Sequence, residues 1–230
     1  QKTFWQHSQQ KTSARNMSAQ IDKSKSTGLF GGTFDPVHIG HVNIVRQVLA
    51  HTALTQILVM PAATPPHKQH RTITSGNHRL AILRLAFAGE PDVIVSDLEL
   101  VRESVSFTVT TAAELQADLA QPLYLIIGMD SLCELHTWVE AQRLVSTYPI
   151  VVYGRPGVSP PDWDALCGRF GEDAAKKLTA SILAAPELDV SSSVLRSGLQ
   201  ENDEAARKLL PDAVFEYIRD NELYRQMGNG

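Results

Sequence analysis

The sequence predicts an α/β protein with a Rossmann-like, doubly wound, mostly parallel sheet that has helices on both faces. Short apolar runs rich in strand formers alternate with longer segments of helical spacing, and the connections between them are brief. Glycines stand directly after two of the apolar runs, at the strand ends where α/β proteins bind ligands. The 230 residues are 43% hydrophobic and 20% charged, which suits a globular protein with a sizeable core.

Composition divides the chain into a tail and one domain. Gln, Ser, Lys and Thr dominate residues 1–26, where apolar residues are scattered. Such a segment buries too little apolar surface to offset the entropic cost of ordering it. We therefore expect a disordered tail over residues 1–26 and a single domain over residues 27–226.

Charge and cysteine content exclude several classes of protein. The formal net charge of −4 provides no global basic field for nucleic acid or anionic lipid. The 2 cysteines, Cys133 and Cys167, form no CxxC pair, which fits a reduced cytosolic setting. No apolar run approaches the length of a membrane span, and no secretion signal is evident. We expect a cytoplasmic protein without nucleic-acid or membrane partners, and a homo-oligomer is compatible with the sequence.

The first half of the chain has the pattern of a parallel strand–helix–strand series. The run QILVM is short, continuous and rich in strand formers, as in strands that are buried on both faces. Before it, Ile44, Val45, Val48 and Leu49 recur at helical spacing. Short connections between such elements predict a parallel sheet. The expected strands are 27–30, 56–60 and 93–96, with an edge strand at 99–105, and the expected helices are 40–51 and 75–88.

The second of these helices begins with polar residues. Ser75 or Asn77 is placed to cap its N-terminus. His78 and Arg79 fall in its first turn, for which a solvated helix face is the favoured interpretation.

The second half continues the alternation of strands and helices. Hydroxyl residues before an apolar-periodic run mark the start of a helix near residues 191–193, and Pro211 fits the first turn of the last helix. The segment 158–177 is rich in Pro and then in charge, so it is interpreted as an insertion or a loosely packed helix, with Trp163 as a packing residue. The expected strands are 123–127, 149–153 and 182–184, and the expected helices are 106–119, 132–146 and 209–223.

A glycine turn followed by two histidines is the sharpest feature of the sequence. The first strand runs into Gly31 and Gly32, and the motif HIGH follows at the start of the next helix. Glycine lets a bulky anion approach the backbone, and a helix N-terminus directs N–H groups at that anion. His38 and His41 are three residues apart, so they share one helix face. There they can donate hydrogen bonds to phosphate oxygens, or change charge near neutral pH.

The segment GGTFDPVHIGH resembles the signature of the nucleotidyltransferase superfamily that carries an HxGH motif. Within that superfamily the chain looks most like the nicotinate-mononucleotide adenylyltransferases, and the resemblance covers about residues 28–225. Such enzymes transfer a nucleotidyl group and release pyrophosphate. The resemblance implies that His38 and His41 are catalytic. It also implies ATP contacts at Gly31, Gly32, Thr33, Phe34 and Gly40.

Two further motifs of the resemblance carry cations and hydroxyls. The first is PPHK, whose Lys68 lies near the phosphates in the family but, taken alone, is typical of a solvated loop. The second is SSSVLR, which is similar to an ISSTxxR motif that holds the β- and γ-phosphates. Its plain interpretation is a capped helix with an exposed arginine. The resemblance implies that Lys68 and Arg196 are catalytic and that Ser192 and Ser193 bind phosphate.

The remaining candidate residues lie at later strand ends. Gly128 and Asp130 match a G-x-D motif on the nucleotide side, although Asp is also a common helix cap. Trp138 stands where the family stacks a Trp on the nicotinate ring, although a Trp is more often core. Arg155 is a candidate phosphate contact, although an ordinary turn at the end of a strand also explains the Pro and Gly beside it. The implied mononucleotide-binding residues are Ser106, Phe107, Thr108, Trp138 and Arg155, with a simple N-cap as the alternative for Ser106 and Thr108.

These motifs together predict a nicotinate-mononucleotide adenylyltransferase of NAD synthesis that uses ATP. The chain has no GxxxxGK[ST] and no GxGxxG motif, so its phosphate site is of another kind. Mg²⁺ is expected to bind through the ATP phosphates, with no protein metal site, because no soft ligands accompany the two histidines. The alternatives are another HxGH transferase, acting on phosphopantetheine or with CTP, and a catalytically idle nucleotide-binding protein of the same fold.

Overall fold

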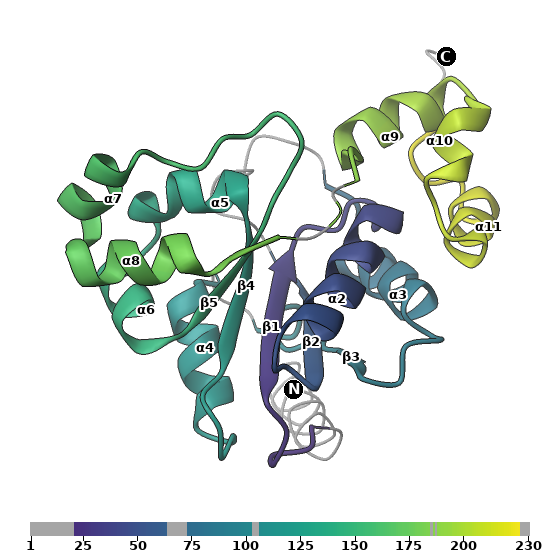
Figure 1. The fold of residues 1–230 in the computed structure, drawn as a ribbon. Helices are drawn as coiled ribbons and strands as arrows, with labels where there is room; N and C mark the ends of the chain where they lie inside the picture. Colours follow the sequence, from purple (N-terminus) through teal and green to yellow (C-terminus); the bar gives the residue numbers. More distant parts are fainter. Residues whose placement is uncertain (1–20, 64–72, 103–105, 185, 187, 226–230) are drawn as a thin grey trace.

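The computed structural model describes residues 21–63, 73–102, 106–184, 186 and 188–225. Its centre is a six-stranded, all-parallel sheet with the strand order β3-β2-β1-β4-β5-β6 (Figure 1). The order reverses between β1 and β4, which creates the topological switch point at which open α/β sheets bind ligands. This arrangement confirms the predicted Rossmann-like class. The strands are β1 (Thr27–Gly32), β2 (Gln56–Pro61), β3 (Val93–Val95), β4 (Tyr124–Gly128), β5 (Ile150–Tyr153) and β6 (Ile182–Leu183).

Helices cover both faces of the sheet (Figure 1). One face packs against α4 (Thr108–Gln116), α5 (Met129–Glu134), α6 (Ala141–Thr147), α7 (Trp163–Phe170) and α8 (Glu172–Ala180). The other packs against α2 (Ile39–His51) and α3 (Gly76–Ala86). The core on this side extends outward to α9 (Ser192–Gln200), α10 (Glu204–Lys208) and α11 (Asp212–Asp220), with α11 packed against α3 and α10 against α9. None of the helices in the described part of the chain has the length and apolar character needed to cross a membrane.

Neighbouring residues of the central strands belong to opposite cores. In β1, Leu29 packs with the α4–α8 side and Phe30 with the α2 side. In β4, Leu125 likewise packs with the α4–α8 side and Ile126 with the α2 side. Each side chain of this kind contributes about 1.5–3 kcal/mol when it is fully buried. The double burial explains why these strands have continuous apolar sequences.

The helix predicted over residues 132–146 is broken in the structure. After α5, a short 3-10 helix η2 (Leu135–Thr137) leads to Trp138, and α6 begins only after Glu140. Glu140 adopts φ 53 and ψ 40, which is left-handed backbone that a right-handed helix cannot contain. The prediction of one continuous helix is therefore wrong.

The structure also differs in detail from the predicted edge strand, the segment 158–177 and the last helix. In the expected edge strand, Leu100 and Val101 instead donate backbone hydrogen bonds to Asp97 O, at 2.9 and 3.1 Å, and form a turn. The segment 158–177 contains α7 and part of α8, and Trp163 at the start of α7 is 43% exposed rather than packed. The short α10 was not predicted. The last helix is shorter than expected and has Pro211 as its N-cap.

The packed structure includes residues that composition assigned to the tail. Ile21 is 8% exposed and belongs to the core on the α4–α8 side. The Gln56 side chain accepts from the Asp22 N–H at 3.1 Å, and Lys23 O accepts from the Ala120 N–H at 3.2 Å. The ordered domain therefore begins before residue 27.

Candidate active site

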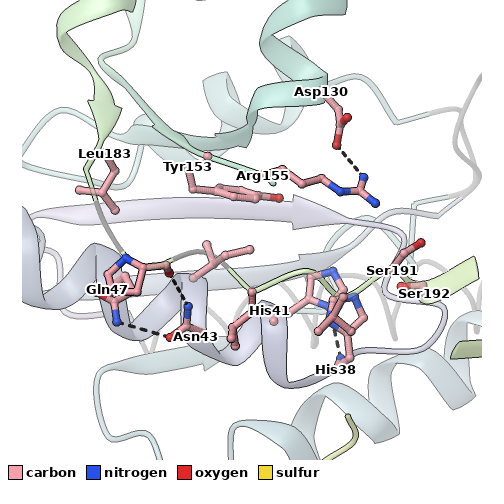
Figure 2. A pocket seen from close by; sticks show the side chains of 16 residues that line it. His38, His41, Asn43, Gln47, Asp130, Tyr153, Arg155, Leu183, Ser191 and Ser192 are labelled. Carbon is pink, nitrogen blue, oxygen red and sulfur yellow. Dashed lines mark hydrogen bonds and ion pairs between the residues drawn. The ribbon is translucent and has the colours of Figure 1, made fainter. Parts of the chain in front are cut away.

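A cavity lies at the carboxyl ends of β1, β4 and β5, beside the switch point of the sheet (Figure 2). The start of α2, the start of α5, the end of β5 and the segment before α9 all contribute to its wall. In Figure 2, Tyr153 and Arg155 lie on one side of it and the two histidines on the other. The polar side chains that line it belong to His38, His41, Asn43, Gln47, Asp130, Tyr153, Arg155, Ser191 and Ser192.

The turn after β1 folds back on itself. Phe34 has φ 49, is 3% exposed and packs edge-on against Phe30 at 5.4 Å between ring centroids. A Cβ at Gly32 would lie 2.9 Å from the Phe34 ring, so glycine is required there by the fold of the turn. Phe34 therefore has a core side chain, and Gly31, Gly32, Thr33 and Phe34 do not line the cavity.

The two histidines stack at the start of α2. Their ring centroids are 3.7 Å apart with a 34° interplanar angle. His38 is the N-cap, and its backbone N–H donates to His41 Nδ1 at 3.2 Å. A Cβ at Gly40 would lie 2.9 Å from His38 Nδ1, so the glycine of the HxGH motif leaves the room that the His38 ring occupies. Gly40 itself lines the cavity.

Both imidazoles are neutral at pH 7 in this structure. Burial lowers the pKa of His38 to about 4, and the positive charge of Arg155 adds to the shift. Burial, with a contribution from His38, holds the pKa of His41 well below its usual value. Because His41 Nδ1 accepts a hydrogen bond, the proton of the neutral ring is on Nε2. The pair can thus donate to an anion, and a charge change near neutral pH is not expected before an anion binds.

Asp130 and Arg155 form an ion pair at neighbouring strand ends. Arg155 Nη1 lies 2.8 Å from Asp130 Oδ2, and both side chains are partly exposed (39% and 53%). An exposed pair of this kind contributes about 0–1 kcal/mol, so either group is available to a ligand. The N-cap of α5 is Gly128, and Asp130 lies in the first turn, so the interpretation of Asp130 as the cap is wrong.

Tyr153 is a cavity residue that the sequence analysis missed. A Cβ at Gly128 would lie 3.0 Å from the Tyr153 hydroxyl, so Gly128 provides the space for this ring. The ring also packs edge-on against Phe30 at 5.8 Å. Burial raises the pKa of Tyr153 to about 12, so its hydroxyl remains a donor at pH 7. A tyrosine at the end of a buried strand was the only signal of this role.

The start of α9 is fastened to the turn after β1. The Ser192 hydroxyl donates to Pro36 O at 3.0 Å, and Arg196 donates to Asp35 O. Ser191, not Ser192 or Ser193, is the N-cap, and its hydroxyl lies 2.7 Å from that of Ser193. Ser191 and Ser192 line the cavity, whereas Ser193 and Arg196 do not.

The residues predicted to bind the mononucleotide lie mostly outside this cavity. Phe107 is the N-cap of α4, without a side-chain cap bond, so the N-cap alternative for Ser106 and Thr108 is wrong. Trp138 is half-buried and packs against the core on the α4–α8 side. Arg155 is the exception and lines the cavity. Lys68 and its PPHK segment lie outside the described residues.

The far end of the cavity contains amide and apolar side chains that were not predicted. Asn43 Nδ2 donates to Pro186 O at 3.1 Å, and Gln47 Nε2 donates to Asn43 Oδ1 at 3.4 Å. Leu183, Leu188 and Val190 lie opposite α2 in the lining. The four-residue spacing of Asn43 and Gln47 indicated a shared helix face, but not that it borders a ligand site.

Residues 29–198 match the family model described as cytidylyltransferase-like. A protein of Rhodopirellula baltica is 36% identical over 199 residues, which cover 86% of this chain and 92% of that protein. One of Herpetosiphon aurantiacus is 38% identical over 200 residues, covering 86% and 97%. Both carry the name "Probable nicotinate-nucleotide adenylyltransferase". The chain belongs to the nicotinate-nucleotide adenylyltransferase family.

A solved structure has the same fold as this chain. It is Plasmodium falciparum nicotinic acid mononucleotide adenylyltransferase complexed with NaAD, with a TM-score of 0.70 and 19% identity. The match covers 87% of this chain and 97% of the Plasmodium chain. The family assignment confirms the resemblance that was read from the HxGH segment.

Proposed function

We propose that this enzyme transfers the adenylyl group of ATP to nicotinate mononucleotide and releases pyrophosphate, as a step of NAD synthesis. The observation that carries the proposal is the convergence of His38, His41, Asp130, Arg155 and Ser192 on one cavity at the switch point of the sheet. Membership of the nicotinate-nucleotide adenylyltransferase family, over nearly the full length of the relatives, supports both substrates.

The chemistry requires no nucleophilic side chain, because the acceptor brings its own oxyanion. A phosphate oxygen of the mononucleotide attacks the α-phosphorus of ATP and forms a P–O bond. The bond from the α-phosphorus to the oxygen that bridges to the β-phosphorus breaks, and pyrophosphate leaves with the electron pair. The protein has to align the two substrates and stabilise the charge of the transition state.

The residues around the cavity fit these tasks. The imidazole N–H of His41 and the amide end of α2 would donate to the α-phosphate, with His38 beside them. Ser192, Ser193 and the amide end of α9 would hold the distal phosphates, and Lys68, Arg155 and Arg196 would supply positive charge. Ser106, Phe107, Thr108 and Trp138 are proposed to contact the mononucleotide, as the family resemblance implies.

We propose Mg²⁺ as the cofactor, carried by the ATP phosphates. Among the residues that the structure describes, Asp130 is the one carboxylate that lines the cavity. Within the described ranges, no cluster of three or more His, Cys, Asp or Glu residues is placed to hold a metal ion. This donor set fits a cation that takes most of its ligands from phosphate and water. When bound, Mg²⁺ would neutralise phosphate charge. A cytoplasmic location is also proposed, because Cys133 and Cys167 are free thiols.

Pyrophosphate release tests the proposed function. The full chain is incubated with ATP and Mg²⁺, and nicotinate mononucleotide, nicotinamide mononucleotide and phosphopantetheine are supplied in parallel reactions. We expect release with nicotinate mononucleotide, and a lower rate with the amide. Release only with phosphopantetheine, or with none of the acceptors although ATP binds, would overturn the proposal.

A further inference from the structure

The side chain of Arg79 is buried in the protein, not spread on the solvated face that its sequence position suggested. Arg79 lies in the first turns of α3 and is 1% exposed. Burial lowers the pKa of this guanidinium, and the nearby Asp35 carboxylate opposes the shift. A guanidinium keeps its charge even so. Burying a charge is costly unless it is well hydrogen-bonded, so the position requires an explanation.

The hydrogen bonds of Arg79 join three separate segments. Its Nη1 donates to Thr33 O at 2.9 Å, in the turn after β1. Its Nη2 donates to Ala63 O at 3.2 Å, just after β2, and its Nε donates to Thr74 O at 2.9 Å, just before α3. The planar fork of an arginine reaches three carbonyls at fixed angles, which the single ammonium of a lysine cannot do.

A second contact reaches the same turn from the far end of the chain. The Tyr224 hydroxyl donates to Asp35 Oδ1 at 2.8 Å, across 189 residues of sequence. Asp35 is 6% exposed, and its backbone carbonyl accepts from Arg196. Two residues of the turn, Thr33 and Asp35, therefore accept hydrogen bonds from Arg79 of α3 and from Tyr224 after α11, neither of which lines the cavity.

We infer that Arg79 and Tyr224 are positioning residues for adenylyl transfer, because they fix the turn 33–37 that sets His38 and the start of α2 against the cavity. The inference rests on the proposed function. Neither side chain lines the cavity, so both act through the turn and not on the substrate. We call the hydrogen bonds of Arg79 and Tyr224 to Thr33 and Asp35 the clamp. A misplacement of about 1 Å in a catalytic group can lower the rate about 100-fold, and we expect a loss of this size when the clamp is weakened.

Two substitutions test the inference, each with a matched control. Arg79→Lys keeps the charge and loses the fork, whereas Arg84→Lys changes an exposed arginine of the same helix. Tyr224→Phe removes only the hydroxyl that reaches Asp35. Tyr217→Phe removes a hydroxyl that lies 3.0 Å from His78 Nδ1, in a contact between α11 and α3 that does not include the turn.

We expect kcat/KM for ATP to fall about 100-fold in Arg79→Lys and about 10-fold in Tyr224→Phe. The KM for nicotinate mononucleotide should stay within about twofold, since the proposed mononucleotide contacts lie elsewhere. Global destabilisation would also leave KM unchanged, because it lowers only the active fraction, so hydrogen exchange separates the two cases. Hydrogen exchange should accelerate in a peptide that covers residues 31–38 and stay unchanged in one that covers β4. Both controls should match the wild type.

The inference is overturned if Tyr224→Phe matches Tyr217→Phe in both kinetics and exchange, whether or not Arg79→Lys folds. It is also overturned if exchange accelerates equally across the sheet. Failure of the proposed function has a different signature, because the wild type itself would then release no pyrophosphate. In that case faster exchange confined to residues 31–38 would still support the clamp.

Discussion

His41 is prepared as a hydrogen-bond donor by its own helix. The His38 backbone N–H bonds to its Nδ1 and leaves Nε2 protonated on a neutral ring. A neutral donor does not repel the guanidinium of Arg155, which lies across the cavity from the two histidines (Figure 2). In the proposed reaction, its hydrogen bond to a phosphate would strengthen as negative charge develops, because the bond would then become charge-assisted.

His41→Ala should lower kcat by about 100- to 1000-fold, the typical loss when one preorganised donor is removed. The far-ultraviolet circular dichroism spectrum should not change. His51→Ala provides the control, since His51 is exposed in the last turn of the same helix. Steady-state kinetics on both variants measure the effect. A His41→Ala enzyme within about threefold of the wild type would remove His41 from the mechanism.

Stability should depend on pH through His38. Its pKa is about 4 in the folded protein against 6.5 in the unfolded chain. Between these values the unfolded state binds more protons, so the free energy of unfolding falls as pH drops from 6.5 toward 4. Each pKa unit contributes about 1.4 kcal/mol.

The measurement is urea denaturation of the wild type and of His38→Gln from pH 7.5 to pH 5. The difference in unfolding free energy between the two proteins should shrink or change sign toward the acid end. Parallel profiles would show that His38 binds protons alike in both states.

Single residues were predictable from sequence where the local chain fixes their place. His38 and His41 share a helix start, so their proximity follows from spacing. Arg79 was not predictable, because its three carbonyl partners come from segments that only the folded sheet brings together. Tyr153 was missed for the same reason, since its space depends on Gly128 of the neighbouring strand.

At the scale of elements, the site depends on how closely α9 packs against α10. A Cβ at Gly198 in α9 would lie 2.7 Å from the Ala206 side chain of α10. The same helix carries Ser192 and Arg196, which bond to the turn after β1. Displacement of α9 should therefore shift the turn after β1 and the cavity wall as well as the packing of the core.

Gly198→Ala should lower the free energy of unfolding by about 1–3 kcal/mol, because overpacking outweighs the gain in helix propensity. It should also reduce kcat/KM for ATP. Gly168→Ala in α7 is the control, since its Cβ would meet nothing within 4 Å. That variant should gain about 0.5–1 kcal/mol. Urea denaturation measures the free energy of unfolding, and steady-state kinetics measure kcat/KM for ATP. Equal changes in the free energy of unfolding of the two variants would contradict the packing argument.

Elements were predictable where hydrophobic pattern alone specifies them. The central strands are continuous apolar runs, and α2 has clear helical spacing. The break before α6 was not visible, because Glu140 gives no sequence signal for left-handed backbone. The short α10 escaped notice because five residues are too few for a periodic pattern.

At the scale of the whole molecule, the strand order places the HxGH motif and the G-x-D motif at the same carboxyl edge of the sheet. β1 pairs with β2 and β4, so the HxGH helix and the start of α5 meet at the switch point. The class of fold was predictable from the alternation of elements. The extent of the cavity was not, because Asn43, Leu188 and Val190 reach it only through the crossing of α2 and the chain before α9.

ATP should stabilise the entire domain. At 100 times its Kd, a ligand that binds only the folded state adds about 2.7 kcal/mol. For a domain of this size that corresponds to an increase in Tm of roughly 5–10 °C. Differential scanning fluorimetry with ATP, with CTP as the comparison nucleotide, provides the measurement. An equal shift with both nucleotides would contradict a site that selects adenine.

The contacts that α9 and Tyr224 make with the turn after β1 also determine when, during synthesis of the chain, this turn can become ordered. β1 and α2 are synthesised first, whereas Ser192, Arg196 and Tyr224 come 156, 161 and 189 residues after the turn residues that they contact. Until then the turn lacks these partners, although Arg79 can already bond to it, and the apolar side of α2 and α3 lacks its cover from α9 to α11. The nascent polypeptide is thus expected to be inactive as an enzyme, and to need protection from aggregation, until α9 to α11 have been synthesised and can fold onto it.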